Sequence, residues 1–510
     1  MAKKVIIIGA GVAGLSAGCY ARMNGYEAEI YEAHTQPGGL CTSWKRKGYT
    51  IDGCLHWLTG SSPKDSFYKL WSELGAVQGR CMIDHDVFYR LTGSDGRTFV
   101  VYCDADRLEA HMKELSPKDS DTIELFCRLI RRFAKFQMPI GKPYELYNIF
   151  DVIPLIIRMR PFGKDLNFLN SITIGEFSER FKDPLLRETF PMLLLERNVP
   201  LLYLVATLST LHKKAGGFPE GGSLEFVRAI EKRFSNLGGK AFFNCRVEKI
   251  LEENGRAVGV RLADGREIKG DYVVSAADLR TTLFEMLGGR HVDPMHEELF
   301  QTCKLFPSSV QVSFGVDMDL SSEPECLGEW YKLKNPLTVG NQNVDWLMVK
   351  NFCYDPSLAP KGKSVVECFF WIDDFQYWEK LAGDTDAYRV EKERIAEAVA
   401  NELGHKYPGF ESAIEVTDVA TPTTYVRYTG NWKGTYMTWV ITPDKVKRFR
   451  MVKKTVPGLD NFWLSGMWVQ PPGGVPTGVM TSRAIIQLMC KKDKKRFQTS
   501  IPSAGELGLI

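Results

Sequence analysis

Hydrophobic residues near the start of the chain form three blocks with different spacings. Val5 to Ile8 are four β-branched residues in succession, a pattern typical of a strand buried on both faces. The run 15–23 then predicts a helix, and 28–31 predicts a second strand. Because a helix separates two buried strands, this stretch predicts a βαβ unit.

Glycines occupy the turn between the first predicted strand and the helix. Gly9, Gly11 and Gly14 have the G-x-G-x-x-G spacing, which allows a tight turn, close contact with a pyrophosphate, and close packing of helix on sheet. Glu32 ends the second strand, close to the roughly 20-residue separation at which an acid binds ribose hydroxyls. These features predict a dinucleotide site and disfavour NADP. An export signal is a poor alternative, because its removal would discard the motif.

A second glycine pair follows this unit. Gly38 and Gly39 lead into the loop 40–44 and a short alternating segment, 49–57. A nicotinamide enzyme would be expected to continue with another βαβ unit at this point. A loop that exposes its backbone instead suits a larger cofactor, whose far end is reached by a second loop.

The later segments differ in periodicity. Hydrophobic residues have helical spacing at 108–115 and 122–134, which predicts a largely helical region. An amphipathic helix with Ser223 as its N-cap is expected next, followed by three strands with hairpin turns at 254–255 and 264–265. The strands and aromatic residues that come after predict a sheet that walls a substrate chamber.

The predicted fold class is α/β with α+β insertions. A Rossmann-like dinucleotide-binding domain is assembled from three chain segments, and the inserted substrate domain has a mixed sheet and a helical subdomain. The expected division is 1–64 for the first cofactor segment, 65–212 for the helical subdomain facing substrate or membrane, 213–292 for the second cofactor segment, 293–452 for the substrate-domain sheet, and 453–510 for the third cofactor segment with a C-terminal helix and tail.

Composition narrows the function classes. A net charge of +3 is too small to predict a nucleic-acid partner. No stretch approaches the ~20 apolar residues needed to span a bilayer. The 12 cysteines show no C-x-x-C pair, so we expect reduced thiols, no metal site and a cytoplasmic protein.

Taken in order, these motifs resemble those of FAD-dependent phytoene desaturases and retinol saturases, within the amine-oxidase-like flavoprotein fold. The resemblance covers the whole chain. It rests on the N-terminal glycines and Glu32, and on the following motifs: "GGLCTSWKRKGYTIDGCLHWLTG" at 38–60, "FPEGG" at 218–222, Val247 within "CRVEKI", Gly466, and "PPGGVPTG" at 471–478.

The resemblance implies non-covalent FAD, since the closing loop contains no cysteine. In the N-terminal segment it assigns the pyrophosphate to Gly9, Gly11 and Gly14, and the adenosine ribose to Glu32. The ribityl chain and flavin are assigned to the loop with Gly38, Gly39, Leu40, Thr42 and Ser43. In the later segments, Val247 is assigned to the adenine side, and Gly466, Gly474 and Val475 to the pyrophosphate and flavin ring. Ala13, Ala33 and Ala276 are assigned to the same cofactor site.

The resemblance also implies an oxidoreductase that acts on C–C or C=C bonds of a hydrophobic unsaturated substrate, such as a carotenoid, retinoid, isoprenoid or fatty acid. Desaturation, saturation and isomerisation all remain open. A flavin amine oxidase is the first alternative, although Leu40 replaces an arginine common in that branch and Met467 replaces a frequent acid. A prenyl-protein binder, like the GDP-dissociation inhibitors, is the second, although it would not need the flavin-binding glycines.

Several side chains are candidates for the substrate side of the flavin. His56 is the candidate acid/base or orienting group, with a hydrogen-bonded structural histidine as the alternative. Trp57, Gly221 and Gly222 are candidates for substrate binding, with core packing as the alternative for the tryptophan. Arg197 is a candidate clamp for an acidic head group, against a surface or domain-contact arginine.

An apolar patch at 146–162 contains Arg158 and Arg160, and Lys164 follows it. This combination suits docking on a membrane surface to take up a lipid. A buried helix broken at Pro154 explains the patch equally well. The sequence leaves the oligomeric state open.

Overall fold

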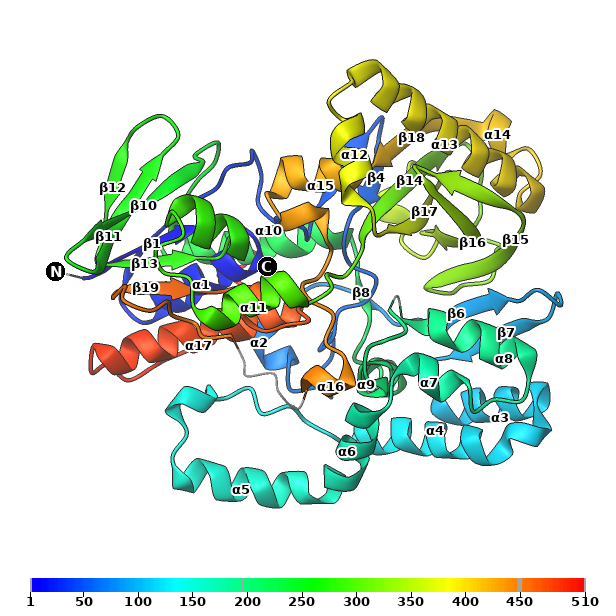
Figure 1. Cartoon of the computed structure of the whole chain (residues 1–510), viewed down its shortest axis with the longest axis horizontal. Helices are drawn as coiled ribbons and strands as arrows, with labels where there is room; N and C mark the ends of the chain where they lie inside the picture. The colour runs from blue at the N-terminus through cyan, green and yellow to red at the C-terminus, as the bar shows by residue number, and fades with distance from the viewer. Residues whose placement is uncertain (1, 195, 447–451, 509–510) are drawn as a thin grey trace.

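A parallel sheet built from three separated parts of the chain lies at the left of Figure 1, as predicted. Its strand order is β19–β13–β1–β2–β9. The computed structural model describes residues 2–194, 196–446 and 452–508. The strands are β1 (Lys4–Ile8), β2 (Glu27–Tyr31), β9 (Lys240–Phe242), β13 (Tyr272–Ser275) and β19 (Phe462–Leu464).

Both faces of this sheet are covered, which explains the unbroken apolar run of β1. Val5 and Ile7 pack in one hydrophobic cluster with Leu15, whereas Ile6 and Ile8 pack in another on the opposite face. The first face carries the helices α1 (Val12–Met23), α10 (Gly222–Asn236) and α17 (Val475–Lys492). The second face carries an antiparallel sheet of β10 (Val247–Glu253), β11 (Arg256–Leu262) and β12 (Glu267–Lys269), whose turns confirm the two predicted hairpins.

A seven-stranded sheet lies at the right of Figure 1, with β6 and β7 below the other strands. Its order is β18–β14–β17–β16–β15–β6–β7, and α13 (Thr385–Lys406) packs on one face through Ile395, Val399 and Leu403. The strands are β6 (Val87–Thr92), β7 (Thr98–Tyr102), β14 (Ser308–Val316), β15 (Gly328–Val339), β16 (Gln342–Asn351), β17 (Ser364–Ile372) and β18 (Ile414–Ala420).

Two of these strands come from the region that the sequence predicted as largely helical. β6 and β7 form a hairpin, and β6 pairs in parallel with β15, far along the chain. The two predicted helices in the region are confirmed within α3 (Ala105–Leu115) and α4 (Ser120–Ala134). The other α-helices there are α2 (Tyr68–Glu73), α5 (Ile149–Met159), α6 (Gly163–Ser171), α7 (Ile174–Ser178), α8 (Pro184–Thr189) and α9 (Leu201–His212).

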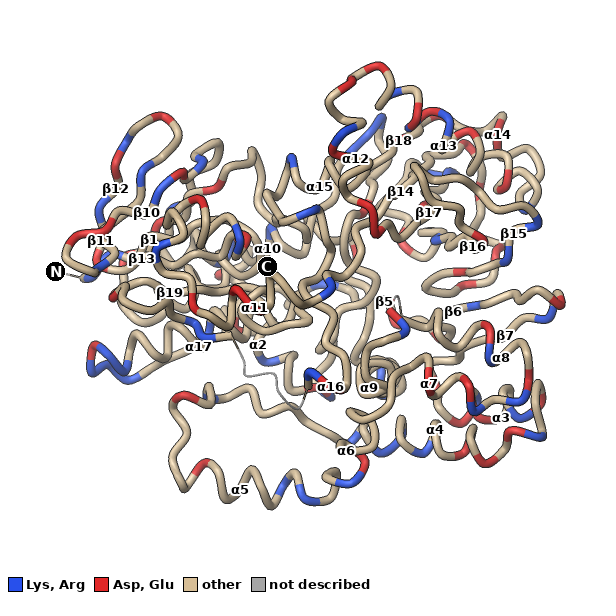
Figure 2. The backbone as a smooth tube through the Cα atoms, viewed as in Figure 1, with Lys and Arg blue, Asp and Glu red and all other residues tan. Residues whose placement is uncertain are grey.

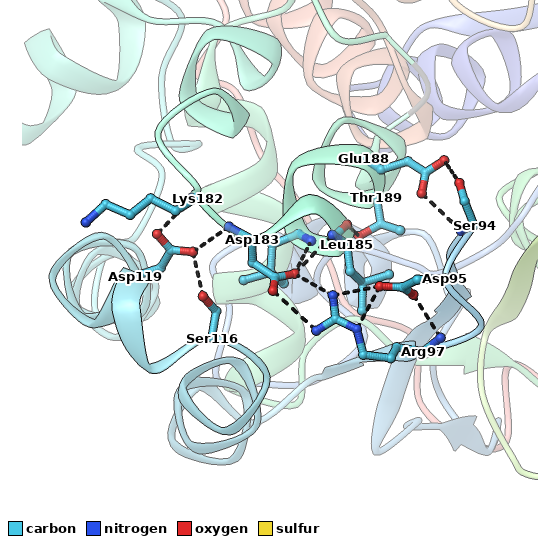
Figure 3. Close-up of polar contacts among 11 residues, drawn as sticks. Ser94, Asp95, Arg97, Ser116, Asp119, Lys182, Asp183, Leu185, Glu188 and Thr189 are labelled. Atoms are coloured by element: carbon cyan, nitrogen blue, oxygen red, sulfur yellow. Dashed lines mark hydrogen bonds and ion pairs between the residues drawn. The ribbon is translucent and has the colours of Figure 1, made fainter.

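A polar network fastens the β6–β7 hairpin to these helices (Figure 3). Arg97 pairs with Asp183 at 3.1 Å, and the same carboxylate caps the N-terminus of α8. Asp119 accepts hydrogen bonds from the backbone of Lys182 and Asp183 at 2.9 and 3.0 Å. The network therefore joins the edge of the sheet to the helical layer through side chains that are far apart in sequence.

Helix α5 stands apart from the rest of the molecule at the bottom of Figure 1. The predicted break at Pro154 is wrong, because the helix continues through this residue. Pro154 cannot donate a hydrogen bond to the carbonyl of Phe150, one turn earlier. No side chain of α5 is buried, so this carbonyl has access to water.

Short elements complete the described fold. They are β3 (Ser43–Arg46) with β4 (Tyr49–Asp52), β5 (Met82–Ile83) with β8 (Phe218–Pro219), α11 (Pro294–Thr302), α12 (Phe375–Leu381), α14 (Phe410–Ala413), α15 (Pro422–Thr429) and α16 (Pro443–Val446). All 12 cysteines are free thiols. In the described part of the chain, no helix is both long and apolar enough to cross a bilayer.

Candidate functional site

The glycine turn after β1 presents bare backbone at the N-terminus of α1. Gly9 has φ +95°, and a β-carbon on Gly14 would stand 1.9 Å from the Gly9 carbonyl oxygen. The first hydrogen bond of the helix runs from Leu15 N to Gly11 O, at 3.0 Å. The amide groups between these two residues therefore precede the helical ladder, and free amide groups at a helix N-terminus can bind an anion.

The second glycine pair lies directly on the first turn. Gly38 N donates to Ala10 O at 3.0 Å, and Gly38 pairs with Gly11 in an isolated bridge. A β-carbon on Gly38 would meet the Cys41 carbonyl oxygen at 2.4 Å, and one on Gly39 would lie 3.6 Å from the Cα of Gly11. Two loops that are separate in sequence therefore form one backbone-lined cradle.

Glu32 lies beside this cradle, at the carboxyl end of β2. Its carboxylate accepts hydrogen bonds from Ala10 N at 2.6 Å and His34 N at 2.9 Å. These contacts fix its orientation, and a carboxylate retains further lone pairs that can accept from ribose hydroxyls. Ala33 follows on the surface of the molecule.

The second and third cofactor segments close the cradle from the other side. Ala276 N donates to Ile8 O at 3.0 Å. A β-carbon on Gly466 would stand 3.7 Å from the Ala13 Cβ and 3.9 Å from the Ala276 carbonyl oxygen. Gly474 is the N-cap of α17, with φ +105°, and Val475 is the first helical residue. The three cofactor segments therefore converge at the start of α1.

The remaining predicted cofactor residues lie on the flanks of this cradle. Val247 begins β10 and is 5% exposed, and Leu40 is half-buried. The Thr42 hydroxyl accepts from Gln36 Nε2 at 3.2 Å, and Ser43 is buried at the start of β3. Their contacts with FAD stay predictions.

A buried charged cluster lies beyond the β3–β4 hairpin, and the sequence analysis missed it. Lys350 of β16 is 1% exposed, and the carboxylates of Asp52 and Glu367 are buried near it. Asp52 accepts from the backbone and hydroxyl of Ser223 at 2.6 and 2.7 Å, and its own amide donates to Glu367 Oε1 at 2.9 Å. The available signal was a charged residue beside a run of apolar residues in each of two strands, Lys350 after 346–349 in β16 and Glu367 between 365–366 and 368–372 in β17.

Burial changes the acidity of each member of this cluster. It lowers the pKa of Lys350 to about 8, although the charges of Asp52 and Glu367 oppose the shift. Burial raises the pKa of Asp52, and burial together with Asp52 raises that of Glu367 well above its usual range. Ser223 belongs to this cluster, and its prediction as an N-cap is wrong, since the helix cap is the left-handed Gly221.

His56 lies between the cluster and a partly accessible aromatic surface. Its Nδ1 is 3.5 Å from the Lys350 ammonium nitrogen, and its ring is 5.5 Å from that of Phe369. Burial, and then the Lys350 charge, hold the pKa of His56 well below its usual range. The imidazole is therefore neutral near pH 7 and able to both donate and accept a hydrogen bond.

Aromatic rings continue from His56 as a surface that we call the aromatic wall. The Phe369 and Trp371 rings are parallel at 6.3 Å, and Tyr436 follows at 5.0 Å from Trp371. Trp57 contacts the Phe88 ring edge to face at 5.5 Å. The wall consists of Trp57, Phe88, Phe369, Trp371 and Tyr436, which belong to one hydrophobic cluster.

The other predicted substrate residues lie in different surroundings. Gly221 N donates to Asp355 at 2.8 Å, and a β-carbon on Gly222 would stand 2.4 Å from the Asp52 carboxylate. The Arg197 side chain is 58% exposed and 4.0 Å from Glu179. Substrate binding by these three residues stays a prediction. Among the described residues, no group of three or more His, Cys, Asp or Glu side chains could hold a metal ion.

Comparison with known proteins identifies the family of this chain. A family model described as flavin-containing amine oxidoreductase matches residues 12–486. The phytoene desaturase (lycopene-forming) of Pseudescherichia vulneris is 26% identical over 512 residues, covering 96% of this chain and 99% of the relative. The chloroplastic prolycopene isomerase of Daucus carota is 25% identical over 470 residues, covering 84% of this chain and 71% of the relative.

A solved structure shows the same fold. The oxidoreductase from Methanosarcina mazei superimposes with a TM-score of 0.58 at 18% identity, covering 95% of this chain and 100% of that one. The bare glycine cradle, the open helix N-terminus and Glu32 fit the pyrophosphate and ribose of FAD. The family match spans nearly the whole chain, and the protein therefore belongs to the flavin-containing amine oxidoreductases, as an FAD-dependent enzyme.

Proposed function

We propose that the enzyme changes the double bonds of a polyene, such as a carotenoid or a related isoprenoid. The main support for this proposal is the aromatic wall, which adjoins His56. His56 lies at the end of the chain segment that leaves the glycine cradle. A flat conjugated chain gains dispersion and stacking contacts along such a surface and needs few polar partners. The names of the desaturase and isomerase relatives support the same substrate class.

The chain divides the work between a cofactor side and a substrate side. The cradle holds FAD, which supplies hydride or electron exchange when bound. The N-terminus of α17, beginning at Val475, contributes a positive helix end beside the cofactor segments. The aromatic wall excludes water and aligns the polyene, while His56 offers a neutral hydrogen-bonding group next to it.

The charged cluster argues against an amine substrate. A protonated amine at His56 would lie near the Lys350 ammonium group, and two like charges in a poorly solvated site repel each other. The intact cradle argues against a prenyl-protein binder, because a protein without flavin has no physical need for these glycines. The polyene therefore remains the favoured substrate.

The test is a two-stage assay. The purified protein is first examined by visible absorption, and bound FAD is released by heat and quantified. The flavoprotein is then incubated with an all-cis and a less desaturated carotenoid, under oxidising and reducing conditions, and the products are separated by chromatography. A changed polyene supports the proposal. A colourless protein that stays colourless with added FAD overturns it, and so does turnover of amines alone.

We further propose that α5 docks on a membrane surface from which the substrate is taken. Most of its large apolar side chains are exposed, with Phe150 at 83% and Ile157 at 67%. Figure 2 shows basic residues at the C-terminal end of the helix, where Arg158 and Arg160 lie. An apolar face bordered by cations matches an interfacial helix on anionic lipid.

A further inference from the structure

The ammonium group of Lys350 makes three kinds of contact in its buried site. It lies 3.1 Å from the Leu55 carbonyl oxygen and 3.5 Å from His56 Nδ1. The ring of Phe352 faces it at 4.3 Å, and that of Phe218 at 5.2 Å. These partners direct the cation toward the backbone and the imidazole.

The contact between Lys350 and His56 restricts the tautomer of the imidazole. An ammonium group is a donor only, so Nδ1 has to accept with its lone pair. The single proton of a neutral imidazole then resides on Nε2. Within the described part of the chain, His56 Nε2 has no hydrogen-bond partner, and the side chain keeps some accessible surface.

Acidic neighbours keep the lysine charged where an isolated buried lysine would lose its proton. Asp52 and Glu367 lie on the neighbouring strands β4 and β17, and Cys54 lies beyond β4. His85 and Tyr354 also lie near the cluster, and their rings contact each other at 4.5 Å. Cys41, Asp418 and Tyr425 are further titratable groups near its carboxylates. His85 is neutral, because burial and then Lys350 lower its pKa to about 4.

We propose that Lys350 is a positioning residue, which holds His56 as a neutral Nε2–H imidazole whose proton is available to the substrate side of the aromatic wall. The substrate role rests on the proposed polyene function, whereas the tautomer does not. In this arrangement His56 orients or polarises a bound molecule as a hydrogen-bond donor, without carrying a positive charge of its own.

The direct test is nitrogen NMR of the wild-type holoenzyme with isotope-labelled histidine. Comparison with His56→Gln assigns the His56 signals. The expected result is an unprotonated Nδ1 and a protonated Nε2 that persist below the usual histidine pKa of 6.5. An Nδ1–H tautomer, or ordinary titration near this value, would overturn the proposal without any assay of activity.

Variants of Lys350 then separate positioning from simple packing. Lys350→Met removes the donor, so it is expected to raise the His56 pKa and to abolish the preference for the Nε2–H tautomer. Lys350→Arg retains a cationic donor, so it is expected to preserve this preference in part. Lys454→Met is the matched control, because Lys454 is also nearly buried and pairs with Glu145 at 2.6 Å. An unchanged tautomer in a folded Lys350→Met protein would contradict the proposal.

The same samples test the polyene activity and the tautomer of His56 separately. Visible absorption and polyene conversion report on the proposed function, and the NMR signals report on the lysine alone. If Lys350→Met fails to fold, the wild-type tautomer still decides the question. If His56 has the Nε2–H tautomer but the enzyme does not convert polyenes, the role of Lys350 stands and the proposed substrate class is wrong.

Discussion

The α-carbon of Gly14 lies so close to Gly9 that a β-carbon on Gly14 would stand 1.9 Å from the Gly9 carbonyl oxygen. A methyl group on Gly11, in contrast, meets only the Gly38 carbonyl oxygen, at 3.7 Å, which is ordinary contact. The two glycines therefore serve different purposes. Gly14 allows helix α1 to pack on the sheet, whereas we expect Gly11 to keep the space for the pyrophosphate free.

Gly11→Ala is expected to fold normally but to bind FAD at least about tenfold more weakly, because the new methyl group occupies the phosphate space. Gly14→Ala is expected to lose both thermal stability and FAD, because the backbone of the turn has to move. Thermal unfolding of the apo proteins and FAD titration measure the two effects. Equal destabilisation of both apo proteins would contradict this separation.

Glu32→Ala is expected to weaken FAD binding by about tenfold, since it removes a charged acceptor of hydrogen bonds from ribose. It also releases Ala10 N, which donates to Glu32 at 2.6 Å. Glu29→Ala on the same strand is the control, because Glu29 pairs with Lys4 at 2.6 Å instead. Isothermal titration of the apo proteins with FAD measures the affinity of both variants. An equal loss of FAD affinity in Glu32→Ala and Glu29→Ala would show that Glu32 has no special role in binding.

Arg483→Met is expected to reduce the free energy of unfolding by about 3–5 kcal/mol, because it leaves the buried Glu73 charge without its partner. Arg483 of α17 lies 3.2 Å from Glu73 of α2, with side-chain exposures of 8% and 1%. Tyr20 of α1 donates to the same carboxylate at 2.8 Å, so the contact joins three helices of the cofactor side.

Arg228→Met provides the comparison for this prediction. Arg228 and Glu225 form a surface pair, each 48% exposed, and solvent screening limits such pairs to about 1 kcal/mol or less. Urea unfolding of the apo proteins, followed by fluorescence, gives both values. A loss for Arg483→Met no greater than for Arg228→Met would show that the buried pair contributes little.

Lys350 is expected to make the free energy of unfolding rise with pH between about 8 and 10.5. Burial lowers its pKa from 10.5 to about 8, so in this window the unfolded chain binds a proton that the folded chain does not. The cost of the buried charge is present below this window and is relieved as pH rises, by up to about 3 kcal/mol. Urea midpoints of wild type and Lys350→Met across the window test this, and parallel curves would count against it.

Replacement of Phe150, Ile153, Ile156 and Ile157 by serine is expected to abolish sedimentation with vesicles of phosphatidylcholine and phosphatidylglycerol. The side chains are exposed, so the fold and the FAD content should not change. Val390→Ser and Ile501→Ser alter exposed apolar residues elsewhere and serve as the control. Undiminished vesicle binding by the α5 variant would exclude this helix as the docking surface.

The cofactor side of the fold was predictable because its signals are local. The β-branched run of β1, the glycine spacing and the acid at the end of β2 each act within a few residues of chain, and the structure has β1, α1 and β2 in that order. The hairpins of the β10–β12 sheet were predictable for the same reason, since their turns carry Asn-Gly and Asp-Gly.

The substrate side was not predictable in this way. The β6–β7 hairpin lies among helices in sequence, and only its pairing with β15 makes it part of a sheet. Ser223 precedes a helical pattern like an N-cap, but its hydroxyl binds Asp52 from a distant segment. In each case a long-range contact outweighed the local preference.

The sequence by itself determined the dinucleotide motif, the order of the cofactor segments and the candidacy of His56. The tertiary structure alone decided that Lys350, Asp52 and Glu367 meet behind this histidine, and that the apolar face of α5 is exposed. The physical reason is that a phosphate-binding motif consists of residues close together in the sequence. A buried charge, in contrast, acquires its partners and its shifted pKa only when folding brings distant strands together.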